Sequence, residues 1–355
     1  MAFIHGIGFS GSPSPPAIDL HCDSVGFLGR GIDLRQENPQ GHVDLPRLRR
    51  GAVGLQVFAA FVPSSTVAAF SAALEMLDRI DEFAASDPLL VSVETAEESI
   101  EAIARGQTAV LRAVENGLAI EDSLDNLAAL RRRKVRIMTL VHLQDLSWAA
   151  SCTGTGSPLD TGDTGGGLSR FGKEVVAAMN DLGMIVDLSH GAESTFWDVL
   201  GVSKKPVIAS HSCAYSLCAS PRNLKDDQIK ALGDSGGLIG VCFFPAFLSE
   251  GYRRALGADF AAQGEDKDKL ADAMARHPVP FSMVADHIDH MVRLAGEDCV
   301  GIGSDFDGVF SLPLGVGGCD CYPLLADELR QRGYTEERIQ KIFNGNFLRI
   351  FHEFN

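Results

Sequence analysis

Eight short apolar runs, each of strand length, recur along the chain. They are rich in valine and isoleucine, and most are continuously apolar rather than alternating, which is typical of parallel strands covered on both faces. The runs span residues 17–23, 54–61, 108–116, 135–142, 184–190, 206–212, 238–244 and 299–308.

The segments between these runs mostly carry apolar residues at intervals of three and four, the spacing of amphipathic helices. The clearest are residues 66–84, 168–182, 224–233, 284–296 and 336–352. Strand and helix repeated eight times predict a (β/α)8 TIM-type barrel. We expect one domain over residues 1–355, with active-site loops inserted at about 151–167, which is glycine-rich, and 245–280.

Composition narrows the class of protein. With 355 residues, 45% of them hydrophobic and 22% charged, the chain is long and apolar enough for a large core. A net charge of −16 argues against a nucleic-acid partner, which needs a basic face. There is no basic stretch before Arg30 and no apolar run near the ~18 residues of a membrane helix, so we expect a cytoplasmic protein without a membrane partner.

Eight cysteines occur without any pair of C-x-x-C motifs, and several lie in apolar runs. Buried free thiols are the expectation. Cys319 and Cys321, in "GGCDCYP", are the ambiguous pair, read either as a thiol site or as part of a loop.

Polar side chains gather at the carboxyl ends of the runs. In a (β/α)8 barrel these ends all point into one mouth, so we expect the side chains to converge there. The residues are His21, Asp23, Glu115, His142, His190, His211, Asp305 and Asp307.

Imidazole and carboxylate ligands at this density predict a divalent metal site of the zinc kind. Five of these residues exceed what one catalytic zinc needs. Two ions roughly 3.5–4 Å apart, bridged by a carboxylate and a nucleophilic hydroxide, would use them all. The five are His21, Asp23, Glu115, His190 and His211. Strand alternation places His21 and Asp23 on the inner face and Cys22 on the outer one, toward the helices.

An H-x-D on the first strand is the signature of the amidohydrolase superfamily. Many members of this superfamily carry a carboxylated lysine that bridges the two metals. No lysine ends any of the eight runs here, so Glu115 would take the bridging position. In this the chain resembles the membrane (renal-type) dipeptidases, peptidase family M19. The likeness extends through "IDLHCDS", "AVENG", "IMTLVH", "GLSRFGKEVVAAMNDLGMIVDLSH", "PVIASHSCAYSLCASPRNL", "HIDHM", "VGIGSDFDGV" and "NGNFLRIFHE".

The resemblance implies a role for each residue. His21 and Asp23 hold one zinc, His190 and His211 the other, and Glu115 bridges the two.

Beside the metals, His142 binds the substrate carbonyl and stabilises the oxyanion, and Arg222 binds the C-terminal carboxylate of a dipeptide. Asp305 moves the proton from the nucleophile to the leaving amine, with Asp307 as the alternative. The family also implies a homodimer. The segment "HLQDLSWAAS" departs from the family pattern after the histidine, which bears on substrate preference.

Two other functions stay open. One is an amidohydrolase acting on a non-peptide amide, lactam or lactone, and the other is a metal-binding module without catalysis. His287 and His290 are spaced i, i+3 on a predicted helix before the last strand, where a structural role is the expectation. The serines of "LSH" and "ASHS" lack the G-x-S-x-G context of a serine hydrolase.

Overall fold

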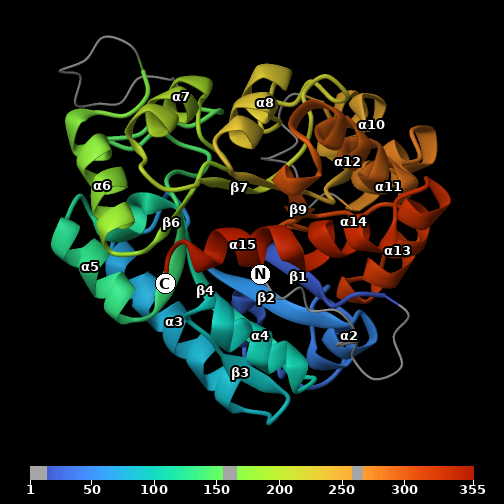
Figure 1. Cartoon of the computed structure of the whole chain (residues 1–355), viewed down its shortest axis with the longest axis horizontal. Helices are drawn as coiled ribbons and strands as arrows, with labels where there is room; N and C mark the ends of the chain where they lie inside the picture. Colours follow the sequence, from blue (N-terminus) through green and yellow to red (C-terminus); the bar gives the residue numbers. More distant parts are fainter. Residues whose placement is uncertain (1–13, 155–165, 258–266) are drawn as a thin grey trace.

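The computed structural model describes residues 14–154, 166–257 and 267–355 (Figure 1). Most of the loop predicted at 151–167 therefore lies outside the described residues. The stretch predicted as a loop at 245–280 is helical over much of its described part, with α9 (Pro245–Leu248), α10 (Glu250–Leu256) and α11 (Lys267–Arg276).

Eight parallel strands close into a barrel. Their order around it is the order of the chain, and β2 pairs with β4 to close the ring. The strands are β1 (Ala17–Cys22), β2 (Val53–Phe61), β4 (Thr108–Glu115), β5 (Val135–Thr139), β6 (Ile185–Asp187), β7 (Ile208–Ser212), β8 (Leu238–Val241) and β9 (Val300–Ile302). Each lies within or over one of the eight apolar runs, so the predicted (β/α)8 architecture is confirmed.

Helices surround the ring (Figure 1). The five helical segments expected from periodicity are present as α3 (Ala69–Ala85), α6 (Arg170–Asp181), α8 (Asp226–Asp234), α12 (Ser282–Ala295), and α14 (Glu336–Gln340) continuing through a π-helical turn (Lys341–Gly345) into α15 (Asn346–His352). The others are α1 (Val25–Gly29), α2 (Leu45–Arg50), α4 (Ala96–Ala104), α5 (Leu124–Arg132), α7 (Glu193–Val202) and α13 (Tyr322–Gln331). Side-chain oxygens of Thr95, Ser123 and Ser169 cap α4, α5 and α6.

One strand was not predicted. β3 (Leu90–Ser92) pairs with the first residues of β4, on the edge that β5 occupies further along. With only three residues, it is too short to show a hydrophobic period in the sequence.

Two hydrophobic clusters divide the core. The inner one holds residues such as Ile18, Leu55, Leu111 and Ile208 from the strands, together with Phe351 of α15. In Figure 1, α15 crosses in front of the strands.

This helix closes the amino-terminal end of the barrel. Asn344 donates to Pro16 O, just before β1, and Asn346 donates to Val300 O, at the start of β9. Because the amino-terminal end of the barrel is closed in this way, the carboxyl ends of the strands are at the opposite, open end.

The outer cluster packs strand residues such as Phe58 against helix residues such as Leu77.

Candidate metal centre

Glu115, the last residue of β4, is the meeting point of three histidines. Its Oε1 lies 2.9 Å from His190 Nε2 and 3.6 Å from His211 Nε2, and its Oε2 lies 3.5 Å from His21 Nε2. His190 Nε2 and His211 Nε2 are themselves 3.0 Å apart. All four residues are buried, so these ligand atoms face one another rather than solvent.

A second group adjoins the first through His21. Its Nε2 lies 3.4 Å from Asp23 Oδ2, and ligand atoms of His21, Asp23 and Asp305 all lie within 4.8 Å of one another. His142 forms a comparable group with Glu115 and His190. The structure therefore brings together every metal ligand named from the sequence, and it places His142 with Glu115 and His190, and Asp305 with His21 and Asp23.

Four of these residues do not lie in strands, contrary to the sequence prediction: Asp23, His142, His190 and Asp305. β1, β5, β6 and β9 end at Cys22, Thr139, Asp187 and Ile302, and the chain then turns. His190 and Asp305 each come three residues after a strand and have φ of 68° and 64°. Backbone in the left-handed region is uncommon for residues other than glycine, although histidine and aspartate adopt it more often than most, and when held by surrounding structure it is typical of functional sites.

Alternation along β1 is also interrupted. Ile18 and Leu20 belong to the inner cluster, and Cys22 belongs to the outer cluster as predicted. A regular strand would place Leu20 and Cys22 on the same face. The pairing with β2 shifts register between Asp19 and Cys22, and this irregularity lets His21 turn inward beside Asp23.

Burial and charge set the protonation of the centre. Burial lowers the pKa of His190 and of His211 well below the usual value, so both imidazoles are neutral. Burial alone would raise the pKa of Glu115, but the neighbouring His21 and His190 hold it well below its ordinary value. Neutral imidazoles around an ionised carboxylate are the donor set that zinc prefers.

The pKa of His21 shifts in the opposite direction from those of His190 and His211, and this shift also indicates a metal site. Burial alone would lower its pKa, but the carboxylates of Glu115 and Asp23 raise it well above the usual value. A positive charge is thus favoured between these two carboxylates. His21 Nε2 and Asp23 Oδ1 are also buried without a hydrogen-bond partner. A divalent cation would supply that charge and occupy both atoms, so these residues fit a metal.

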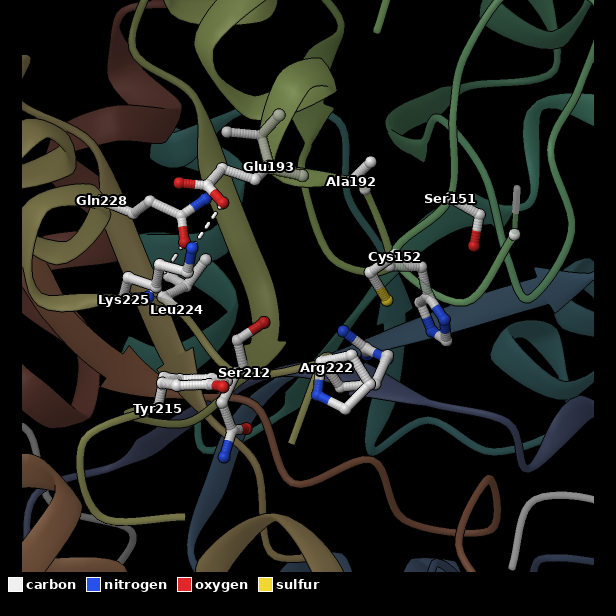
Figure 2. Close-up of a pocket in the computed structure, with 16 residues that line it drawn as sticks. Ser151, Cys152, Ala192, Glu193, Ser212, Tyr215, Arg222, Leu224, Lys225 and Gln228 are labelled. Atoms are coloured by element: carbon white, nitrogen blue, oxygen red, sulfur yellow. Dashed lines mark hydrogen bonds and ion pairs between the residues drawn. The ribbon is translucent and has the colours of Figure 1, made fainter. Parts of the chain in front are cut away.

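Arg222 lines a cavity of about 330 Å3 beside the centre, together with His190, Cys152 and Tyr215 (Figure 2). It is only 6% exposed. Its Nη2 donates to His211 O at 3.3 Å, whereas Nε and Nη1 have no partner. A buried guanidinium with free donors in a cavity is suited to binding an anion, because a carboxylate restores both the charge balance and the missing hydrogen bonds.

Asp307 does not share the position of Asp305. It accepts hydrogen bonds from Ser24 Oγ and from the backbone N–H of His42. The alternation that would have placed both aspartates on one face fails because β9 ends at Ile302. Asp307 therefore connects two loops, and Asp305 is the aspartate next to His21 and Asp23.

Sequence reasoning missed the residues behind the ligands. Asp19 and Asp187 are completely buried and accept hydrogen bonds from the segments that carry the site. A signal was present, because a serine precedes His190, His211 and Asp305 in turn, in "LSH", "ASH" and "GSD". Gly308 was missed too, since a Cβ there would collide with Asp23 Oδ2 and Asp305 Oδ1.

The histidines for which the sequence predicted a structural role lie outside the metal cluster, and the cysteines are free thiols. His287 accepts from the backbone N–H of Ala214 through Nδ1, and its Nε2 lies 3.1 Å from Leu248 O. His290 Nε2 lies 2.8 Å from an oxygen of Asp226. All eight cysteines are among the described residues and are free, and all but Cys152 are buried, including Cys319 and Cys321.

Comparison with known proteins agrees with this geometry. The model of the membrane dipeptidase family, peptidase family M19, matches residues 13–355. The chain belongs to this family. Its members are metallopeptidases, so a metal cofactor is implied, and the cluster around Glu115 is the candidate place for it.

Relatives within the M19 family include Dipeptidase 3 of Mus musculus and of Homo sapiens, each 34% identical over 347 residues. The match covers 95% of this chain but 64% and 65% of theirs, so the chain spans just under two thirds of the length of these relatives. None of the described helices is long and apolar enough to cross a membrane.

Two solved structures of similar proteins share the whole architecture. One is a metallopeptidase from Rhodobacter sphaeroides liganded with a phosphinate mimic of the dipeptide L-Ala-D-Ala, with a TM-score of 0.81 and 26% identity, covering 96% of this chain and 99% of that one. The other is the M19 metallopeptidase dipeptidase AC, with a TM-score of 0.81 and 28% identity, covering 96% of this chain and 98% of that one.

Proposed function

We propose that this M19 protein is a zinc-dependent dipeptidase that hydrolyses the single peptide bond of dipeptides, including those with a D-residue at the C-terminal side. The observation that carries the proposal is the position of Arg222. Arg222, whose Nε and Nη1 are buried without a hydrogen-bond partner, lines the cavity that His190 also lines, beside the cluster around Glu115. A substrate with a free carboxylate near its scissile bond matches that arrangement.

Two zinc ions are proposed, one held by His21 and Asp23, the other by His190 and His211, with Glu115 shared. Bound there, they would polarise the scissile carbonyl and lower the pKa of a bridging water, so that hydroxide is available as the nucleophile near neutral pH.

The chain's own residues would position the substrate and move its proton. Arg222 would hold the C-terminal carboxylate, which fixes the scissile bond over the centre. His142, whose ring centroid lies 4.3 Å from that of His190, would donate an N–H to the carbonyl oxygen as negative charge develops. Burial lowers the pKa of His142, so it acts as a neutral donor.

Asp305 would accept the proton from the attacking water on a carboxylate oxygen and give it to the leaving amine nitrogen. Without bound metal, burial raises its pKa to about 8, with His21 opposing the shift and Asp23 adding to it. A carboxyl group with a pKa near the working pH can both take up and release a proton.

The test is hydrolysis of an L,L and L,D dipeptide library by zinc-reconstituted protein, alongside elemental analysis. Glu115→Gln keeps the side-chain shape but removes the charge, and we expect it to lose both bound metal and hydrolysis. Glu174→Gln, at an exposed carboxylate paired with Arg170, is the matched control. Two retained zinc ions and full activity in Glu115→Gln would overturn the assignment.

The alternative within hydrolases is an amide, lactam or lactone without the carboxylate. It predicts turnover of such compounds but not of dipeptides. A metal-binding module without catalysis predicts bound zinc and no turnover at all. A homodimer and a cytoplasmic location are also proposed; sedimentation of the purified protein and fractionation of the source cells test them.

A further inference from the structure

Asp187 is a completely buried carboxylate that none of the proposed catalytic steps uses. Its Oδ1 accepts the backbone N–H groups of Ser189 at 3.0 Å and Ser210 at 2.8 Å. These are the residues immediately before His190 and His211. One carboxylate therefore fixes the backbone of both histidine-bearing segments.

The second oxygen of Asp187 acts on the imidazole of His211. Oδ2 accepts the hydroxyls of Thr139 and Ser210, the latter at 2.6 Å. Because Ser210 has a single proton and gives it to Asp187, its Oγ must accept from His211 Nδ1, 2.8 Å away. The proton of neutral His211 is thereby held on Nδ1, and Nε2 presents a bare lone pair to Glu115 and His190.

Asp19, at the end of the site built by β1 and β9, has a parallel arrangement. It too is completely buried. Its Oδ1 accepts the N–H groups of Ser304 at 2.9 Å and His21 at 3.3 Å. Its Oδ2 accepts Ser304 Oγ and Tyr322 OH, both at 2.6 Å. Ser304 immediately precedes Asp305, so Asp19 fixes the backbone beside both His21 and Asp305.

Each carboxylate thus accepts four hydrogen bonds, and the two sets of donors are different. We propose that Asp187 and Asp19 are positioning residues for separate halves of the metal centre. Asp187 would position the ion at His190 and His211, and Asp19 the ion at His21 and Asp23. This inference rests on the proposed two-ion function and adds that each half has its own support.

Metal binding, not activity, gives the direct test. Asp187→Asn and Asp19→Asn are matched controls for each other, because each removes one buried charge from an equivalent network. Wild type is expected to retain two zinc ions per chain during dialysis against graded chelator. Each variant should retain one ion with unchanged affinity and bind the other about 10–100-fold more weakly, the usual effect of removing such a support.

Double variants identify which ion is lost. Adding His211→Ala to Asp187→Asn should remove no further ion, because both changes affect the same half. Adding His21→Ala to Asp187→Asn should leave the chain without tightly bound metal. The pattern should invert for Asp19→Asn. Equal weakening of both ions in either single variant, or no weakening in both, would overturn the proposal.

Ser210→Ala keeps the test decisive if an aspartate variant does not fold. It deletes only the hydroxyl between Asp187 and His211, so we expect about tenfold weaker binding of one ion. Ser210→Thr restores the hydroxyl and should restore the affinity, whereas unchanged binding in Ser210→Ala would contradict the role of Asp187. If the proposed two-ion function itself is wrong, the experiment gives a different result, because wild type then binds fewer than two ions.

Discussion

His190 Nε2 and His211 Nε2 lie 3.0 Å apart, although His190 follows β6 and His211 lies in β7, and neither side chain is exposed. Because the Ser210 hydroxyl holds the His211 proton on Nδ1, the lone pair of His211 Nε2 points at this meeting place. Glu115 Oε1 reaches the same place from β4. Three donor atoms, from β4, from β7 and from the turn after β6, thus share one point.

Replacing Arg222 by methionine should weaken the interaction with the substrate without destabilising the folded protein. We expect kcat/KM for dipeptides to fall by the equivalent of about 2–5 kcal/mol, because a substrate carboxylate would lose its buried partner. The free energy of unfolding without substrate should not fall, because a buried guanidinium with two unpartnered nitrogens is removed. Steady-state kinetics and urea unfolding measure both quantities.

Arg170→Met, at a highly exposed arginine, is the control for the Arg222 variant. A normal kcat/KM in Arg222→Met would contradict carboxylate binding.

Replacing Asp305 by asparagine should remove proton transfer and leave the metal in place. We expect kcat to fall by about 10²–10⁴, the usual contribution of a general acid–base group. The rise in kcat with pH that reports ionisation of Asp305 should disappear as well. The measurements are a pH–rate profile and elemental analysis.

Asp307→Asn is the comparison, because Asp307 bonds to Ser24 and His42 rather than to the cluster. It should lower kcat by less than about tenfold on the same scale. A larger loss in Asp307→Asn than in Asp305→Asn would exchange their roles.

A methyl group at Gly308 should disturb two carboxylates at once. The added Cβ of Gly308→Ala would overlap Asp23 Oδ2 and Asp305 Oδ1, so one or both must move. We expect weaker metal binding and a lower kcat, with a cost to stability of about 1–3 kcal/mol. In Gly317→Ala, further along the same loop, the Cβ would meet nothing within 4 Å. Similar metal affinity in the two variants would show that the space at Gly308 is unimportant.

His287 should make stability depend on pH away from the metal centre. Burial lowers its pKa to about 4 in the folded protein, against 6.5 when unfolded. A lowered folded pKa gives stability that is present above pH 6.5 and is lost as the pH falls from 6.5 to 4, because only the unfolded chain takes up the proton readily. The full effect is about 3 kcal/mol.

The measurement is the difference in unfolding free energy between wild type and His287→Asn at several pH values. That difference should shrink as the pH falls through this range. A difference for His287→Asn that is constant with pH would contradict the prediction.

The sequence by itself determined the barrel and the convergence of polar side chains at one end of it. Continuous apolar runs separated by amphipathic segments can be buried on both faces only in a helix-covered parallel sheet, and this follows from local composition. The carboxyl ends of such strands meet at one end of the barrel, so the polar residues at six of the eight run ends were enough to predict that they converge there.

Only the tertiary structure decided which way individual side chains face. The register shifts between Asp19 and Cys22 in β1 and between Ala209 and Ser212 in β7, together with left-handed backbone at His190 and Asp305, depend on pairing between distant strands. A period of two along the chain cannot contain that information. The role of Asp187 also cannot be predicted from the sequence, where it is one polar residue in an apolar run. Its hydrogen bonds with Ser210 and Thr139 form only in the folded barrel. Hydrogen bonds between residues far apart in sequence exist only once the barrel has closed.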